Sequence, residues 1–404
     1  MKNRIAERIS RLHTESAFQI LARANELEAR GKSVVHLEIG QPDFKTPENI
    51  IEAAYRAMKE GKTGYGPTPG IIPLRETIAQ YCADYKKVKT GADEIVVTPG
   101  GKPVMFFTML MLSQKGDEVI YPNPGFPIYE SVINFAGAKP VPMPLLEENN
   151  FRVDLQKLKS SINERTRVII INNPGNPTGG MFSRDDILAI AEMVRGKKIY
   201  ILSDEIYDRI IFGEQPLSIA SLPDMKDQTI ILDGFSKTYA MTGWRLGYGV
   251  MNRELAEHMS MLMVNSASCA ATMTQWAAIE ALKGPQDAVT KMTAAFKERR
   301  DYLVDALNRI EGISCAMPQG AFYVFPNVSS FGLSSSEFAG RLLEEAGVAA
   351  AGGTAFGGFG EGFLRLSYAN SLPNLKIAVE RIAAFCASIK NPAPEGGKLS
   401  PRIK

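Results

Sequence analysis

Residues 199–205, IYILSDE, form a short apolar run that ends in two acidic side chains. Residues 229–236, TIILDGFS, repeat this pattern, as do EIVVTPG at 94–100, DEVIYPN at 117–123 and VIIINNP at 168–174. Helical patterns follow three of these runs, at 102–114, 126–136 and 183–195. Short apolar strands that alternate with helices predict an α/β fold, in which a mostly parallel sheet is flanked by helices on both faces.

The last third of the chain has a different pattern, which predicts a smaller α+β domain. A long helical pattern covers 285–310, and shorter ones cover 334–345 and 373–389; between them lie GAFYVFP at 320–326 and FLRLSYA at 363–369. Near the N-terminus, Leu21, Ala24 and Leu27 recur at helical spacing before Gly31. We expect four parts: an N-terminal segment packing with the small domain (1–46), a large domain (47–285), a small domain (286–391) and a loose tail (392–404).

Composition and charge describe an ordinary globular protein. Of 404 residues, 45% are hydrophobic and 22% charged, and the formal net charge of +2 favours neither a nucleic-acid nor a membrane partner. The N-terminus lacks the apolar core of a secretory signal, and the four cysteines lack CxxC spacing, so we expect reduced thiols and a cytoplasmic location. Three isolated histidines argue against a histidine metal site or a Ser-His-Asp hydrolase.

Polar side chains end three of the apolar runs. They are Asn172, Asn173 and Asn176 after one, Asp204, Glu205 and Tyr207 after another, and Ser236 and Lys237 after a third. Ligands of open α/β sheets lie at the carboxyl ends of strands, which makes these side chains candidates for a site. A lysine there is either an ordinary solvated loop residue or a nucleophile with a lowered pKa.

A glycine pair in TPGGKPVMFF, residues 98–107, opens a helical pattern. Unpaired amides at a helix N-terminus favour a phosphate, although this sequence matches neither common phosphate-binding motif. Arg245, eight residues after Lys237, offers further donors.

Three motifs in this order, NNPGNPTGG at 172–180, SDEIY at 203–207 and GFSKTYAMTGWRLGY at 234–248, resemble those of class I aminotransferases that use pyridoxal phosphate (fold type I), including bacterial aspartate and aromatic aminotransferases. The resemblance extends from LEIGQPDF at 37–44 to FLRLSYA. It implies transfer of an amino group from an L-amino acid to a 2-oxo acid, such as 2-oxoglutarate or pyruvate, in two half-reactions through aldimine and ketimine forms.

The resemblance also implies roles for residues around the cofactor. Lys237 would form the Schiff base and move the substrate proton, and Asp204 would pair with the pyridine nitrogen. Asn176 and Tyr207 would donate to the phenolic oxygen of the ring. The phosphate would bind Ser236, Arg245, the amides of Gly101 and Lys102, and Tyr65 from a second subunit of a homodimer; Phe126 would stack on the ring, where other members often have Trp.

Substrate roles follow from the same resemblance. Arg365 would bind the α-carboxylate of the substrate, and the backbone at Gly40 would lie near the same group. Lys102 matches a lysine that recognises a distal carboxylate in similar aspartate enzymes, whereas Phe18 suits an apolar side chain, so the amino donor stays open. We also expect cis peptide bonds at Asn123–Pro124 and Asn176–Pro177.

Two alternatives to transamination are compatible with these motifs. Carbon–sulfur lyases of the same fold use an equivalent lysine, and the reaction depends on which substrate bond is aligned. The second alternative is the cofactor-binding half of a transcription regulator. Regulators of this kind carry a DNA-binding domain ahead of the fold, and only some 15 residues precede the first expected helix here.

Overall fold

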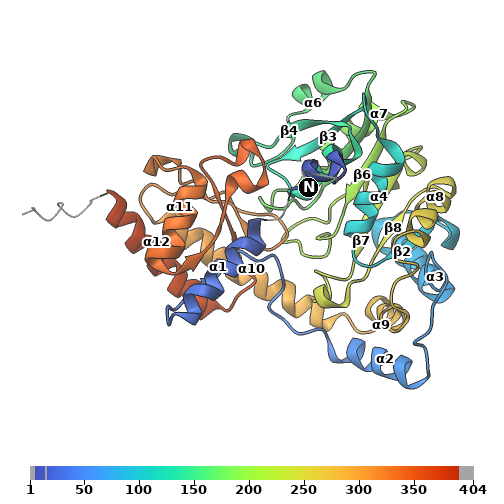
Figure 1. Ribbon diagram of the computed structural model, residues 1–404, viewed down its shortest axis with the longest axis horizontal. Helices are drawn as coiled ribbons and strands as arrows, with labels where there is room; N and C mark the ends of the chain where they lie inside the picture. Colours follow the sequence, from blue (N-terminus) through green and yellow to red (C-terminus); the bar gives the residue numbers. More distant parts are fainter. Residues whose placement is uncertain (1–4, 14–15, 391–404) are drawn as a thin grey trace, which may run out of the picture.

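The computed structural model describes residues 5–13 and 16–390, and its centre is a seven-stranded sheet (Figure 1). The strand order is β2-β8-β7-β6-β5-β3-β4; β8 runs antiparallel to β2 and β7, and the other neighbouring strands are parallel. The strands are β2 (Ile95–Thr98), β3 (Glu118–Asn123), β4 (Lys139–Pro144), β5 (Thr166–Asn172), β6 (Tyr200–Asp204), β7 (Thr229–Gly234) and β8 (Gly247–Val250). The predicted mostly parallel sheet is confirmed.

Side chains of β5 show why this strand is apolar throughout. Val168 and Ile170 pack on one face with α4, α5 and α8, whereas Ile169 and Ile171 pack on the other with α6 and α7. Both faces of the strand are therefore buried, as expected for a parallel sheet covered by helices. The helices of this part are α2 (Glu48–Lys59), α3 (Ile72–Tyr81), α4 (Lys102–Leu112), α5 (Ile128–Ala136), α6 (Leu155–Ser161), α7 (Arg184–Val194), α8 (Arg253–Val264) and α9 (Thr272–Lys283).

Strand β4 carries three prolines, in KPVPMP at 139–144, and was not expected from the sequence. The strand lies at the edge of the sheet and pairs only with β3 among the described strands. Proline cannot donate to a neighbouring strand, so a strand with several prolines is restricted to such an edge.

The second part of the molecule combines the C-terminal third with the N-terminal segment (Figure 1). Its strands are β9 (Tyr323–Val324), β11 (Ala351–Gly352) and β12 (Leu364–Ser367), in the order β11-β12-β9, and a separate parallel pair of β1 (Val35–His36) with β10 (Val348–Ala349). Its helices are α1 (Ser16–Ala29), α10 (Asp287–Asn308), α11 (Ser335–Arg341) and α12 (Leu372–Lys390).

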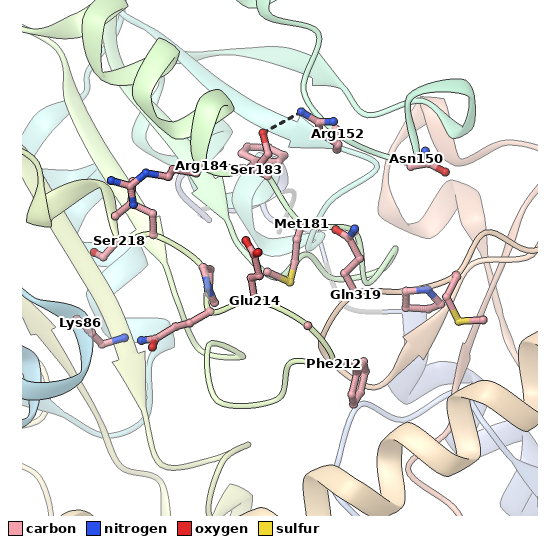
Figure 2. Close-up of a pocket in the computed structure, with 18 of the residues that line it drawn as sticks. Lys86, Asn150, Arg152, Met181, Ser183, Arg184, Phe212, Glu214, Ser218 and Gln319 are labelled. Carbon is pink, nitrogen blue, oxygen red and sulfur yellow. Dashed lines mark hydrogen bonds between the residues drawn. The ribbon is translucent and has the colours of Figure 1, made fainter.

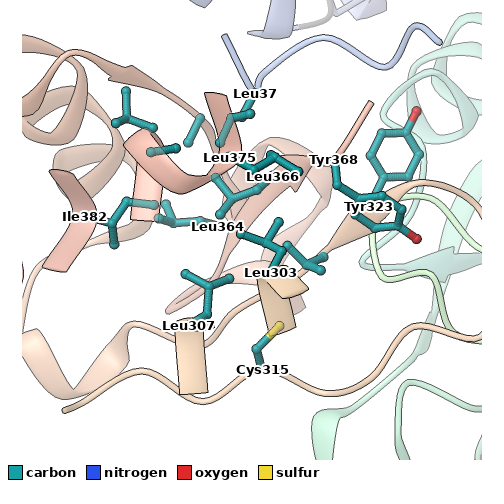
Figure 3. Packing of buried hydrophobic residues seen from close by; sticks show 14 of the residues in the cluster. Leu37, Leu303, Leu307, Cys315, Tyr323, Leu364, Leu366, Tyr368, Leu375 and Ile382 are labelled. Atoms are coloured by element: carbon teal, nitrogen blue, oxygen red, sulfur yellow. The ribbon is translucent and has the colours of Figure 1, made fainter. Parts of the chain in front are cut away.

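Leu37, next to β1, packs among Leu303, Leu366 and Leu375 in the core of this second part (Figure 3). Residues near the two ends of the chain thus share one core. The numerical domain boundaries given above remain a prediction, and the tail from 392 lies outside the described residues. No helix within 5–13 and 16–390 is long and apolar enough to span a membrane.

Helix positions agree with the sequence patterns more closely than the C-terminal strands do. The expected helix at 285–310 is α10, and the expected helix at 373–389 is α12. The run GAFYVFP forms a strand at only two residues, Tyr323 and Val324. Its phenylalanines Phe322 and Phe325 are buried in two different core clusters.

Candidate active site

A cavity of about 630 Å³ lies at the carboxyl ends of β5, β6 and β7. Twelve of the thirteen predicted site residues line it: Phe18, Gly40, Gly101, Lys102, Phe126, Asn176, Asp204, Tyr207, Ser236, Lys237, Arg245 and Arg365. The exception is Tyr65, which is 94% exposed on the loop between α2 and α3.

Asp204, the last residue of β6, is buried beneath the cavity. Tyr129 Oη donates a hydrogen bond of 2.6 Å to Asp204 Oδ2, and the amide of Ile206 donates one of 3.3 Å to Oδ1. Burial raises the pKa of Asp204 to about 6, while these two hydrogen bonds favour its ionised form. A cationic group in the cavity would therefore find a buried carboxylate able to pair with it.

Lys237 follows β7, three residues after Gly234, and its ammonium group donates to the carbonyl oxygen of Gly40. The amine therefore lies between the sheet and the N-terminal segment, inside the cavity. This position places the amine in the same cavity that Asp204 lines.

Tyr207 and Tyr323 meet through their hydroxyl groups, 2.8 Å apart. A Cβ at Gly40 would collide with the Tyr323 hydroxyl, so a glycine at position 40 lets the backbone lie this close to Tyr323. The backbone amide of Asn176 donates a 2.8 Å hydrogen bond to Asn172 Oδ1, which helps to fix the position of Asn176. Tyr207, Asn176 and Gly40 thus come from three chain segments to one wall.

The opposite end of the cavity combines the start of α4 with Arg245. Gly101 precedes the helix, and Arg245 has a positive φ of 52° and donates to the carbonyl of Thr242 at 2.8 Å. A Cβ at Gly100 would collide with the Arg245 guanidinium, which lies directly against that backbone. Helix amides and a guanidinium together suit a phosphate dianion.

Arg365 on β12 is only 4% exposed. Its guanidinium lies 4.7 Å from the ring centre of Tyr323 and 4.8 Å from that of Phe356. One Nη donates to the carbonyl of Glu38 and the other lies 3.3 Å from Asn176 Oδ1, but the buried Nε has no hydrogen-bond partner among the described residues. A buried donor without a partner is costly, and a bidentate carboxylate ligand would satisfy it.

Lys102 and Phe18 lie at the cavity as well. Lys102 Nζ is 5.6 Å from the ring centre of Phe126, and Phe18, on α1, is 59% exposed. Phe126 packs edge-on against Tyr129, with ring centres 5.7 Å apart. The cavity therefore presents both a cation and an exposed aromatic ring to a ligand side chain.

The sequence of residues 32–382 matches the family model described as aminotransferase class I and II. The chain belongs to this family. It is an enzyme that transfers amino groups with pyridoxal phosphate, as the motifs predicted.

Relatives of this aminotransferase cover nearly its whole length. A protein of Aquifex aeolicus named probable aspartate/prephenate aminotransferase is 41% identical over 392 residues, which is 95% of this chain and 98% of that protein. The aspartate aminotransferase of Geobacillus stearothermophilus is 39% identical over 95% of this chain and 98% of its own length. A solved structure of the Thermus thermophilus aspartate aminotransferase with maleate superposes with a TM-score of 0.91 at 35% identity, covering 95% and 100% of the two chains.

The cavity of the aminotransferase fits pyridoxal phosphate by two independent observations. The buried carboxyl of Asp204 lines the cavity, and burial raises its pKa. The positive charge of a pyridinium beside it would lower this pKa again. Gly100 lies so close to Arg245 that a side chain would fill the space where the helix amides and the guanidinium meet.

Two residues that touch these groups were not predicted from sequence. Tyr129 lies three residues after Phe126, at helical spacing, and this spacing is the only signal that could have identified it. Tyr323 lies inside GAFYVFP, where it reads as a core aromatic. The predicted cis bonds at Asn123–Pro124 and Asn176–Pro177 are confirmed, and a third occurs at Asn173–Pro174.

Proposed function

We propose that amino-group exchange takes place at a single site where Lys237, Asp204 and Arg365 have separate roles. They converge on one cavity from the turn after β7, from β6 and from β12, and this convergence is the observation that carries the proposal. When bound, pyridoxal phosphate supplies an aldehyde for covalent capture of the substrate amine and a ring that accepts electrons from the substrate carbon.

In this proposal, Lys237 Nζ holds the cofactor and afterwards moves a proton at the substrate α-carbon. Asp204 keeps its negative charge against the protonated ring nitrogen, helped by Tyr129. Tyr207 and Asn176 orient the ring through its phenolic oxygen. Arg365 binds the substrate carboxylate, with its Nε as one arm of the fork.

The substrates we propose are acidic: an aspartate-like amino donor and a dicarboxylic 2-oxo acid as acceptor. Lys102 at the cavity rim supports this, since its ammonium group could pair with a distal carboxylate. Several relatives are named aspartate aminotransferases, and maleate, present in the Thermus structure, is itself a dicarboxylate. None of the relatives named above is a carbon–sulfur lyase.

A screen of half-reactions tests the substrate class without assuming an acceptor. Each amino acid is added to the cofactor-loaded protein, and loss of the visible absorbance of the lysine-bound cofactor is followed. Aspartate and glutamate should react fastest, and Lys102→Met should slow these two more than it slows alanine or phenylalanine. A faster reaction with aromatic donors, unchanged in Lys102→Met, would assign the site to apolar substrates and leave the aminotransferase activity intact.

We also propose a homodimer in which Tyr65 completes the site of the neighbouring subunit, in a cytoplasmic protein. Two observations support it: Tyr65 is almost fully exposed and away from its own cavity, and its neighbour Gly64 accepts a 2.7 Å hydrogen bond from Thr272. Thr272 ends the segment 265–272, which by family resemblance also reaches the other subunit.

Mixing two impaired variants tests this arrangement. A heterodimer of Lys237→Ala with Tyr65→Ala has one site with an intact lysine and an intact tyrosine only if Tyr65 acts on the other subunit. Co-expression should therefore restore wild-type cofactor affinity in one site per dimer. Absence of recovery in a purified heterodimer would mean that Tyr65 acts within its own chain or not at all.

A further inference from the structure

Lys86 is a lysine buried behind the active site. It ends the helical turn Cys82–Lys86 after α3, and its side chain is 1% exposed. Its ammonium group lies 2.9 Å from Glu205 Oε2 and 3.0 Å from Asp233 Oδ2, and it also contacts Asp208 Oδ2. Lys86 lies at the wall of a second cavity of about 820 Å³, outside the active site (Figure 2).

All three carboxylates lie close in the chain to a residue of the active site. Glu205 follows Asp204 in the chain, and Asp208 follows Tyr207. Asp233 lies on β7, four residues before Lys237. Neighbouring residues of an extended chain face opposite ways, so Asp204 lines the active-site cavity while Glu205 reaches Lys86 behind it.

Hydrogen bonds from neighbouring hydroxyl groups also hold two of these carboxylates. Ser203 and Ser218 donate to Glu205 Oε1 at 2.8 and 2.7 Å. Tyr248 Oη donates to Asp233 Oδ2 at 2.8 Å. Asp208 depends more on Lys86, since its buried Oδ1 has no partner in the described part of the chain.

One ammonium group faces three carboxylates, so the cluster carries a formal charge of −2 when all are ionised. Burial raises the pKa of Asp208 and Asp233, and although burial opposes it, the surrounding carboxylates keep the pKa of Lys86 well above its usual value. The other titratable or charged groups around the cluster are Tyr81, Cys82, Tyr85, Arg209, Tyr239 and Tyr248. Burial raises the pKa of the four tyrosines and the cysteine, which keeps them neutral.

The charge of the cluster reaches the active site. Burial is the main cause of the raised pKa of Asp204, and the negative charges of Asp233 and Glu205 raise this pKa further. Lys86 is the cation in contact with both of these carboxylates, and it therefore reduces their effect on Asp204.

We propose that Lys86 is a positioning residue of the aminotransferase. By binding Glu205, Asp208 and Asp233 together, it fixes the ends of β6 and β7, from which Asp204, Tyr207 and Lys237 reach the cofactor. It also offsets negative charge behind Asp204, so that this carboxylate stays ionised against the ring nitrogen. The inference rests on the roles given to those three residues under the proposed function.

Binding of pyridoxamine 5′-phosphate, measured by calorimetry across about pH 5 to 8, tests this role without any turnover. In the wild type, affinity should fall on the acid side of a midpoint, because protonated Asp204 no longer pairs with the pyridinium. Lys86→Met should weaken binding about tenfold at neutral pH and move the midpoint upward. Glu205→Gln, which keeps Lys86 and removes one negative charge, should move the midpoint downward.

Lys87→Met is the matched control, because Lys87 is the next residue, is exposed, and bonds only to the backbone of Asp84 among the contacts described. Binding by Lys86→Met equal to that of this control would overturn the inference. Should Lys86→Met fail to fold, the midpoint of Glu205→Gln decides, and an unchanged or higher midpoint overturns the inference. The visible absorbance of the wild-type protein with bound pyridoxal phosphate, which should depend on Lys237, is measured first. Its absence would refute the proposed function itself.

Discussion

The hydroxyl of Tyr129 donates a 2.6 Å hydrogen bond to Asp204 Oδ2, and both residues are buried. This pair opposes the effect of burial on Asp204, because a hydrogen bond donated to a carboxylate favours its ionised form. In the proposed site, Tyr129 thereby supports the charge of Asp204 that would pair with the ring nitrogen.

Tyr129→Phe should weaken cofactor binding by about 10- to 100-fold, since a hydrogen bond to a charged group contributes about 1.5–3 kcal/mol. The pKa of Asp204 should rise, so the loss should be larger at pH 6 than at pH 8. Calorimetric titration with pyridoxamine 5′-phosphate measures both. Tyr121→Phe is the control, because it removes a buried hydroxyl that accepts from Asn123 and does not line the cavity. Equal affinities of the two variants would contradict the role of Tyr129.

Asp204→Asn should stabilise the cofactor-free protein at neutral pH. Burial holds the pKa of Asp204 near 6, above the unfolded value of about 3.9, so the folded state binds the proton more tightly. The free energy of unfolding therefore falls as pH rises from about 4 through 6, and the total loss is of the order of 3 kcal/mol. Removing the carboxyl should remove this loss and also weaken cofactor binding.

Urea unfolding of the cofactor-free variant at pH 4.5 and 7.5 measures the effect of Asp204→Asn. Asp224→Asn serves as the control because Asp224 is exposed and has a positive φ of 62°, which asparagine also tolerates. Equal pH dependence of stability in Asp204→Asn and the wild type would show that Asp204 has no raised pKa.

Arg365→Lys should lower kcat/KM for an amino acid and for its oxo acid alike, because both present a carboxylate to the same guanidinium. Lysine keeps the charge but loses the planar fork, and truncating such a buried contact costs about 2–5 kcal/mol, a factor of about 30 to several thousand. Visible absorbance of the bound cofactor should persist. Near wild-type kcat/KM for both substrates would move carboxylate binding to another residue.

Lys237→Ala should abolish covalent capture of the cofactor. Borohydride reduction of the wild type with pyridoxal phosphate, followed by peptide mapping, should label Lys237, and the variant should carry no label. Lys86, which is also buried, serves as an internal comparison, because its salt bridges keep it protonated and unreactive. A label on Lys86 or any other lysine would refute the assignment.

Gly40→Ala should destabilise the protein by about 1–3 kcal/mol, because the added methyl group meets the hydroxyl of Tyr323. Adding Tyr323→Phe should recover part of the loss, and a double-mutant cycle from urea unfolding measures this coupling. Gly340→Ala is the control, since a methyl group added there, on α11, would meet no neighbouring segment of the described chain. Additive effects of the two changes would rule out the contact.

The sheet was predictable because its central strands are buried on both faces. Continuous apolar runs such as 168–171 have few other uses in a chain of this charge, and the polar residues that end them mark the edge where a ligand binds. Strand β4 lacked this signal, because its prolines suit only an edge position. Helix α9 was missed because its fully buried apolar residues are all alanines, Ala277, Ala278 and Ala281, which give only a weak hydrophobic pattern.

Lys86 shows what sequence alone does not reveal. In YKKVK at 85–89, Lys86 and Lys87 have the same local signals, and either would be taken for a solvated lysine. Their difference arises from Asp208 and Asp233, which lie more than a hundred residues away in the chain. Tertiary structure, and not local pattern, therefore decides which lysine is buried.

The contact between Arg365 and the carbonyl of Glu38 joins residues that lie 327 positions apart in the chain. On the ribosome, every residue assigned to the cofactor, from Tyr65 to Arg245, emerges more than a hundred residues before Arg365 does. A nascent chain thus contains all of its own residues assigned to the cofactor before it contains the residue proposed to bind the substrate carboxylate. Synthesis of β12 adds Arg365, and with it the residue that the proposed function assigns to the substrate.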